Sequence, residues 1–160
     1  MNKEERYDVL YRQIDSLIAG EENLVGVLAN VSSAMKEQFP SEYFWVGFYL
    51  VDEKSEALRL GPFQGTVACY TIPYGKGVCG SAWAQGHTLV VADVDAFPGH
   101  IACSSLSRSE IVVPLFAGNR IWGVLDIDST ELGTFDDVDR IGLERIAPLL
   151  SHLGEKCLKP

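Results

Sequence analysis

Three cysteines lie in the central third of this 160-residue sequence, so thiol chemistry is the first chemistry that its residue types suggest. Cys69, Cys79 and Cys103 are separated by spacings of 10 and 24 residues. The opening residues carry no apolar segment of the kind found in secretory signals, so we expect a cytoplasmic protein whose thiols stay reduced. Such thiols are inert, metal-binding or reactive. Cys157 lies far from the others along the chain, and we leave it out of the candidate site.

Cys79 follows a glycine-rich turn at the expected start of a helix, where the helix dipole would stabilise a thiolate. The turn, Gly75-Lys-Gly-Val-Cys-Gly80, matches the G-x-G-x-x-G pattern of dinucleotide sites. That function requires a parallel βαβ unit, whereas the preceding segments look like antiparallel strands. We therefore favour a tight turn whose amide groups face an anion.

Acidic and aromatic residues form a second constellation. Asp126 and Asp128 are two positions apart in an expected strand, so both carboxylates project from the same face, and Glu110 opens the strand expected to pair with it. The cluster could bind an ammonium group or donate a proton, although the solvated face of a sheet would give the same periodicity. Trp45 and Tyr49 belong either to the core or beside a sulfur or ammonium group of a ligand.

Two other uses of the cysteines fit the sequence less well. Structural zinc sites usually contain cysteines two to four residues apart, and no such pair occurs, so we expect no metal and no bound cofactor. His87 and His100 could still complete a zinc site. A Cys–His hydrolase using His100 and Cys103 is a further alternative, but a separation of three residues in a loop fixes no triad geometry.

The elements that must position these residues follow from the hydrophobic periodicity. Apolar residues recur at helical spacing near both ends of the chain, and β-branched and aromatic runs joined by short turns lie between them. We expect helices over about 4–18, 24–39 and 75–86 and from about 134 onward, and strands over 44–51, 57–60, 66–72, 88–92, 111–116 and 121–127. The short turns favour an α+β fold with a mainly antiparallel sheet of about six strands. Residues 93–109 form a long irregular loop, a kind of connection that is often functional.

The overall charge narrows the partners. The formal net charge of −9 repels phosphate backbones and anionic lipid, so we expect neither nucleic acid nor a membrane surface as a partner. The hydrophobic share of 47% is ordinary for a globular fold, and the length suits one domain over residues 1–160.

Five motifs in order closely resemble the free methionine-(R)-sulfoxide reductases, a family built on a GAF domain. The motifs are Gly61-Pro-Phe-Gln-Gly65, Gly77-Val-Cys-Gly80, Pro98-Gly-His-Ile-Ala-Cys103, Ser109-Glu-Ile-Val-Val-Pro114 and Gly123-Val-Leu-Asp-Ile-Asp-Ser129. The resemblance implies reduction of methionine (R)-S-oxide as the free amino acid, with thioredoxin as the external reductant.

The resemblance also implies roles for individual residues. Cys103 would attack the sulfoxide sulfur and become a sulfenic acid, and Cys69 would resolve it as a disulfide. Cys79 would be a third cysteine able to exchange into that disulfide. By the same resemblance, Glu110, Asp126, Asp128 and the aromatic Trp45 would surround the substrate, and the protein would be a homodimer.

Two functions from other classes stay open from the sequence. One is a GAF sensory module that binds a small effector and switches a partner through disulfide formation. The other is a zinc-stabilised interaction domain. Neither a sensory module nor an interaction domain would turn over methionine sulfoxide, so an activity assay separates the reductase from both.

Overall fold

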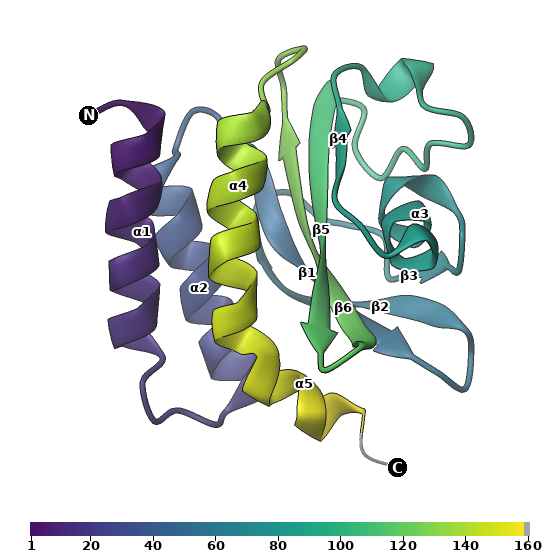
Figure 1. Ribbon diagram of the computed structural model, residues 1–160. Coiled ribbons are helices and arrows are strands. Elements are labelled where there is room, and N and C mark those ends of the chain that lie inside the picture. Colours follow the sequence, from purple (N-terminus) through teal and green to yellow (C-terminus); the bar gives the residue numbers. More distant parts are fainter. Residues whose placement is uncertain (159–160) are drawn as a thin grey trace.

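A six-stranded sheet lies between two unequal layers in the computed structural model, which describes residues 1–158. Long helices cover one face of the sheet, and a short helix with the adjoining loops covers the other (Figure 1). The helices are α1 (Lys3–Leu17), α2 (Leu24–Gln38), α3 (Gly77–Gln85), α4 (Asp137–Ile146) and α5 (Ser151–Cys157), with short 3₁₀ turns η1 (Val94–Ala96) and η2 (Ala147–Leu150).

The sheet has the strand order β3-β2-β1-β6-β5-β4, and each neighbouring pair is antiparallel. The predicted α+β fold with an antiparallel sheet of about six strands is confirmed. The strands are β1 (Trp45–Asp52), β2 (Ala57–Gln64), β3 (Thr71–Pro73), β4 (Leu89–Val91), β5 (Ser109–Ala117) and β6 (Arg120–Ser129).

The two N-terminal helices form where the periodicity predicts them. The side chain of Asn2 caps α1 by accepting a hydrogen bond from the Glu5 amide, and Asn23 caps α2 in the same way through the Gly26 amide. Apolar residues three and four positions apart are then buried: those of α2 pack on the sheet, whereas those of α1 pack against α2 and α4.

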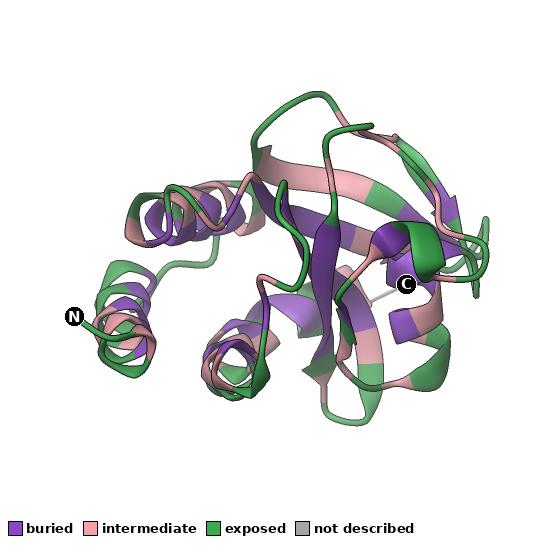
Figure 2. Ribbon diagram, turned by 90° about the horizontal axis from the view of Figure 1, so that it is seen from above, coloured by how far each residue is buried: buried purple, intermediate pink, exposed green. Residues whose placement is uncertain are grey.

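Alternation along β6 divides the interior into two cores. Leu125 and Ile127 face the helix layer and pack with α1, α2 and α4, whereas Val124 packs on the opposite face with α3. Asp126 and Asp128 share the α3 face because they have the same parity as Val124. Figure 2 shows buried residues along the sheet and on the helix faces turned towards it. The helix side is thus an apolar core, while the α3 side combines apolar residues with carboxylates.

The third strand is much shorter than the sequence suggests. The prediction of a strand over 66–72 is wrong for residues 66–70, since β3 contains only Thr71–Pro73. Backbone carbonyls in that segment accept hydrogen bonds from side chains of β1 instead: Trp45 Nε1 donates to Thr66 O at 3.0 Å, and Tyr49 Oη donates to Cys69 O at 2.9 Å. The segment that carries Cys69 is therefore held against β1 by aromatic side chains.

The last helix also begins later than predicted. It starts after Asp136, whose side chain accepts from the Asp139 amide while the Asp139 carboxylate accepts from the Asp136 amide at 2.9 Å. This capping box lies two residues beyond the predicted start near residue 134, where the Thr134 hydroxyl instead donates to Ser129 Oγ at 2.6 Å.

The loop predicted over residues 93–109 is present over residues 93–108, since Ser109 already belongs to β5, and it has one turn of 3₁₀ helix at its start. Its base is closed, since the Val94 amide donates to Arg108 O at 2.9 Å and the Arg108 amide donates to Ser129 O at 2.7 Å. These bonds fix the two ends beside β6, so the loop crosses the α3 face of the sheet and returns. Within residues 1–158, none of the helices has the length and apolar character needed to cross a membrane.

Gly154 allows α5 to approach the sheet closely. A methyl group at this position would overlap the indole ring of Trp122, which is fully buried in β6. We expect Gly154→Ala to lower the free energy of unfolding by about 1–3 kcal/mol, because overpacking a filled core forces neighbouring atoms to shift. Urea denaturation would measure the loss. Glu155→Ala, an exposed change in the same helix, is the matched control, and equal unfolding midpoints for the two variants would contradict the account.

Candidate active site

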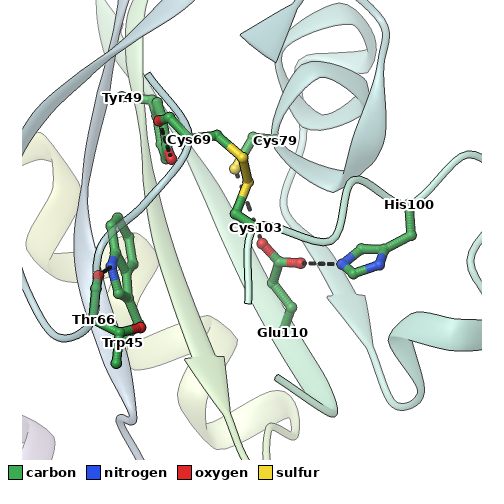
Figure 3. Close-up of a disulfide and its surroundings, with 8 residues drawn as sticks. All are labelled: Trp45, Tyr49, Thr66, Cys69, Cys79, His100, Cys103 and Glu110. Carbon is green, nitrogen blue, oxygen red and sulfur yellow. Dashed lines mark hydrogen bonds and ion pairs between the residues drawn. A yellow bond between two sulfur atoms is a disulfide. The ribbon is translucent and has the colours of Figure 1, made fainter. Parts of the chain in front are cut away.

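A disulfide joins Cys69 and Cys103 on the α3 side of the sheet. Cys69 precedes β3, and Cys103 lies in the loop over 93–109, with a Cα–Cα distance of 5.4 Å. Figure 3 shows this bond close to Cys79 and Glu110. The structure therefore contains the cysteine pair that the family resemblance implies.

A small cavity of about 40 Å³ lies beside the disulfide. It is bounded by the α3 face of the sheet, the start of α3 and the loop that carries Cys103. Seven of the eight predicted site residues line it, and Cys69 is attached to it through the disulfide. The seven are Trp45, Tyr49, Cys79, Cys103, Glu110, Asp126 and Asp128.

Strand register brings the three acidic residues together. Glu110 pairs directly with Asp128 across β5 and β6, and Asp126 is the next residue of β6 on the same face. Glu110 and Asp126 are only 5% and 6% exposed. The alternative of a solvated sheet face is therefore wrong for these two residues, since α3 and the loop cover them.

This crowding changes the acidity of the carboxyl groups. Burial, followed by the neighbouring Asp126 and Asp128 charges, raises the pKa of Glu110 well above its usual range. Burial likewise raises the pKa of Asp126 and of Asp128, and the Asp126 charge adds to the effect on Asp128. Like charges in one desolvated pocket cannot all ionise at low cost, so the site favours retaining a proton or taking up a cation.

Cys79 differs from the sequence-based expectation. It lies near the N-terminus of α3 as predicted, but it is 3% exposed and its thiol donates towards Glu110 Oε2 at 4.0 Å. Burial, with the Asp126 and Glu110 charges, raises the pKa of this thiol well above its usual value. The prediction that the helix dipole favours a Cys79 thiolate is therefore wrong, because desolvation and adjacent carboxylates outweigh one turn of helix dipole.

The glycine-rich turn before α3 serves packing rather than dinucleotide binding. The Gly75 amide donates to Gly80 O, and the Lys76 amide donates to Pro73 O, both at 3.1 Å, so two of its amides are not free to face an anion. Gly77 has a positive φ of 63°, and a Cβ atom there would lie 3.1 Å from Ile101 of the long loop. The absence of a side chain at Gly77 lets the loop pack on the start of α3.

The aromatic residues of β1 form one wall of the cavity. The rings of Trp45 and Tyr49 stack with their centroids 6.0 Å apart, and the polar atom of each ring bonds to the 66–70 segment. Both side chains are nearly fully buried. The wall presents an apolar surface beside the carboxylates, because Trp45 pairs directly with Asp128 across β1 and β6.

His100 lies beside the acidic cluster, a contact that the sequence did not predict. Its Nε2 lies 3.8 Å from Glu110 Oε1 (Figure 3), whereas the sequence suggested it only as a zinc ligand or hydrolase base. The position of His100 in the motif around Cys103 is the signal that could have placed it. The other lining residues come from the 66–68 segment, β3, α3 and the loop: Thr66, Val67, Ala68, Ile72, Gly77, Val78, Ile101, Ser104 and Ser107.

Comparison with known proteins identifies the family. A model of the GAF domain matches residues 21–153. The free methionine-R-sulfoxide reductase of Escherichia coli strain K12 is 47% identical over 153 residues, which are 96% of this chain and 91% of that protein. The chain belongs to the GAF-fold family of free methionine-R-sulfoxide reductases. The family resemblance inferred from the five motifs is confirmed.

Other members of the GAF family agree over nearly the whole chain. GAF domain-containing protein A of Dictyostelium discoideum is 56% identical over 151 residues, or 94% of each chain. The solved structure of the free methionine-R-sulfoxide reductase from Neisseria meningitidis, in complex with its substrate, is 53% identical with a TM-score of 0.94, covering 98% of this chain and 93% of that one. The fold is thus shared with a reductase whose solved structure is a complex with its substrate.

Proposed function

We propose that this protein reduces free L-methionine (R)-S-oxide to methionine. The observation that carries the proposal is a Cys69–Cys103 disulfide beside a cavity lined by three carboxylates. The names of the E. coli and N. meningitidis relatives support the same activity. A cytoplasmic location and a homodimer remain predictions from the sequence.

The first step is attack of the Cys103 thiolate on the sulfoxide sulfur. The sulfur–sulfur bond formed by this attack and the sulfur–oxygen bond of the substrate then break as the protonated oxygen transfers to the Cys103 sulfur, so methionine leaves and Cys103 becomes a sulfenic acid. Sulfur is reduced in the substrate and oxidised in the cysteine, and protonation of the oxygen balances the charge. A carboxylic acid that keeps its proton near neutral pH can supply it, and we assign this to Glu110 because its pKa is raised well above the usual range and it lines the same cavity as Cys103.

The second step converts the sulfenic acid into a disulfide that an external reductant can reduce. The Cys69 thiol attacks the sulfenic acid sulfur, water leaves, and the Cys69–Cys103 disulfide forms. Rapid trapping matters because a sulfenic acid that meets further oxidant becomes irreversibly oxidised. Thioredoxin then reduces the disulfide by thiol–disulfide exchange, and its two thiols become a disulfide. The described structure corresponds to the state before this last exchange.

Selection of the free amino acid requires recognition of the free α-ammonium group, which an internal residue of a peptide lacks. Asp126 and Asp128 suit the α-ammonium group, and the stacked rings of Trp45 and Tyr49 suit the methyl-sulfur end. The cover of loop and α3 excludes a continuing peptide chain. Peptide-linked methionine sulfoxide is therefore not a substrate on this proposal.

We propose that the loop over 93–109 opens for substrate to enter. The loop and α3 cover the cavity, whose volume of about 40 Å³ is only a few times the roughly 10–15 Å³ that one water needs. Cys103 lies on this loop, so breaking its disulfide frees the loop from Cys69 at the same time. We propose that reduction both restores the nucleophile and opens the pocket.

A coupled assay tests the function. Free methionine sulfoxide is supplied as separate R and S epimers with thioredoxin, thioredoxin reductase and NADPH, and NADPH consumption is followed. We expect turnover with the R epimer alone. If neither epimer is turned over, the reductase function is wrong and the effector-binding GAF module becomes the favoured function.

Glu110→Gln tests the proton donor. We expect kcat/KM for the R epimer to fall by roughly 10²–10⁴-fold, the usual contribution of a general acid, because an amide cannot deliver the proton. Glu131→Gln, an exposed change outside the cavity, is the control and is expected to keep the parent rate. Full activity of Glu110→Gln would remove Glu110 from the chemistry.

A further inference from the structure

Cys79, Glu110 and Asp126 bring together side chains of the types that bind transition metals. One ligand atom from each, a thiol sulfur and two carboxylate oxygens, lies within 4.8 Å of the other two, and all three residues are buried. They come from α3, β5 and β6, so three separate elements fix their positions. We call these three residues the Cys79 cluster.

An unsatisfied atom in the cluster points to a ligand. Asp126 Oδ1 is buried and has no hydrogen-bond partner among residues 1–158, in a side chain only 6% exposed. A buried carboxylate oxygen without a donor is costly, and such groups are normally paired with a cation or coordinate a metal. Asp126 is also one of the residues that line the cavity beside the disulfide.

The donor atoms lie somewhat farther apart than the ligands of one bound zinc ion. Bonds from zinc to sulfur and to carboxylate oxygen are about 2.3 Å and about 2.1 Å, so these ligands are about 3.6 Å apart in a tetrahedral site. Cys79 Sγ and Glu110 Oε2 are 4.0 Å apart (Figure 3), and the three donor atoms all lie within 4.8 Å of one another. Binding of a cation therefore requires the ligand atoms to move together by up to about 1.2 Å.

We propose that the Cys79 cluster binds one thiophilic divalent cation of the Zn²⁺ class. The donor set selects this class because thiolate ligands suit zinc and related ions, whereas Mg²⁺ and Ca²⁺ take oxygen ligands. His100, whose Nε2 is 3.8 Å from Glu110 Oε1, or a water molecule completes the coordination. On the proposed function, the cation and the substrate compete for the same carboxylates.

Cobalt spectroscopy on the disulfide form tests the site without any turnover. The sequence has four cysteines, and with Cys69 and Cys103 joined only Cys79 and Cys157 are free. In oxidised Cys157→Ser protein, a thiolate-to-cobalt charge-transfer band in the near ultraviolet can come only from Cys79. We expect this band to saturate at one Co²⁺ per chain and to disappear when Zn²⁺, but not Mg²⁺, is added.

Variants of the cluster complete the test. We expect no band from oxidised Cys79→Ser/Cys157→Ser protein, and weaker cobalt binding by at least roughly tenfold in Glu110→Gln or Asp126→Asn, since even residues that only support metal ligands contribute that much. The zinc displacement uses protein with an intact cluster, so it is informative even if a variant folds poorly. No band at saturating Co²⁺, a band that survives loss of Cys79, or displacement by Mg²⁺ would overturn the proposal. Because no substrate or thioredoxin is present, failure of the reductase function would leave this result unaffected.

Discussion

We expect Cys103→Ser to abolish reduction of free methionine (R)-S-oxide. A serine hydroxyl is a far weaker nucleophile towards sulfur than a thiolate, and it cannot become a sulfenic acid or a disulfide. The rate should fall by roughly 10⁶-fold, the size of loss caused by removing the covalent nucleophile of a hydrolase. NADPH consumption in the coupled assay and methionine released in a single turnover both measure the effect.

Cys157→Ser is the matched control for this substitution. Cys157 is partly exposed at the end of α5, outside the cavity, and makes no disulfide in the structure of residues 1–158. The same chemical change there is expected to leave the rate unaltered. Full activity of Cys103→Ser would show that another cysteine attacks the sulfoxide, and the assignment of roles would be wrong even if the activity is present.

Cys69→Ser is expected to separate the chemical step from recycling. Cys103 keeps its thiol, so reduced protein should still convert one equivalent of the R epimer to methionine. The sulfenic acid then lacks its partner, because Cys69 is the residue whose Cα lies 5.4 Å from that of Cys103. Thioredoxin-coupled turnover should therefore stop after the first cycle.

Cys79→Ser provides the comparison for Cys69→Ser. Cys79 is free and buried beside Glu110 in the disulfide form, and its thiol is held protonated there. If Cys69 alone resolves the sulfenic acid, Cys79→Ser protein still forms the Cys69–Cys103 disulfide. Continued thioredoxin-coupled cycling in Cys69→Ser protein would instead show that Cys79 can take over the resolving role.

Much of the fold could be predicted because local patterns and tertiary structure agree. The helical stripes of α1 and α2 each have one buried face, so periodicity identifies them, whereas β5 and β6 are buried on both faces and are identified by their β-branched and aromatic composition. The alternation of side chains along a strand placed Asp126 and Asp128 on one face, with Glu110 on the strand expected to pair with theirs. Strand register, which put Glu110 directly opposite Asp128, then followed from adjacent strands joined by a short turn.

The rest depended on contacts that no local pattern encodes. Residues 66–70 have the composition of a strand, but the side chains of Trp45 and Tyr49 take up their carbonyl groups. Cys79 looked like an activated thiol because the sequence displays its helix start and not the carboxylates from β5 and β6 that surround it. The three residues of the Cys79 cluster are likewise up to 47 residues apart in the sequence, so a search for closely spaced metal ligands does not find them.

The central claim is that Cys103 reduces the free sulfoxide and Cys69 resolves it. Fully reduced protein is mixed with free methionine (R)-S-oxide in the absence of any reductant, and the products are quantified and the disulfide located by mass spectrometry. We predict one methionine per chain, a disulfide between Cys69 and Cys103, and no reaction with the S epimer. Absence of methionine, or methionine accompanied by a disulfide that involves Cys79 in place of Cys69, would contradict the account.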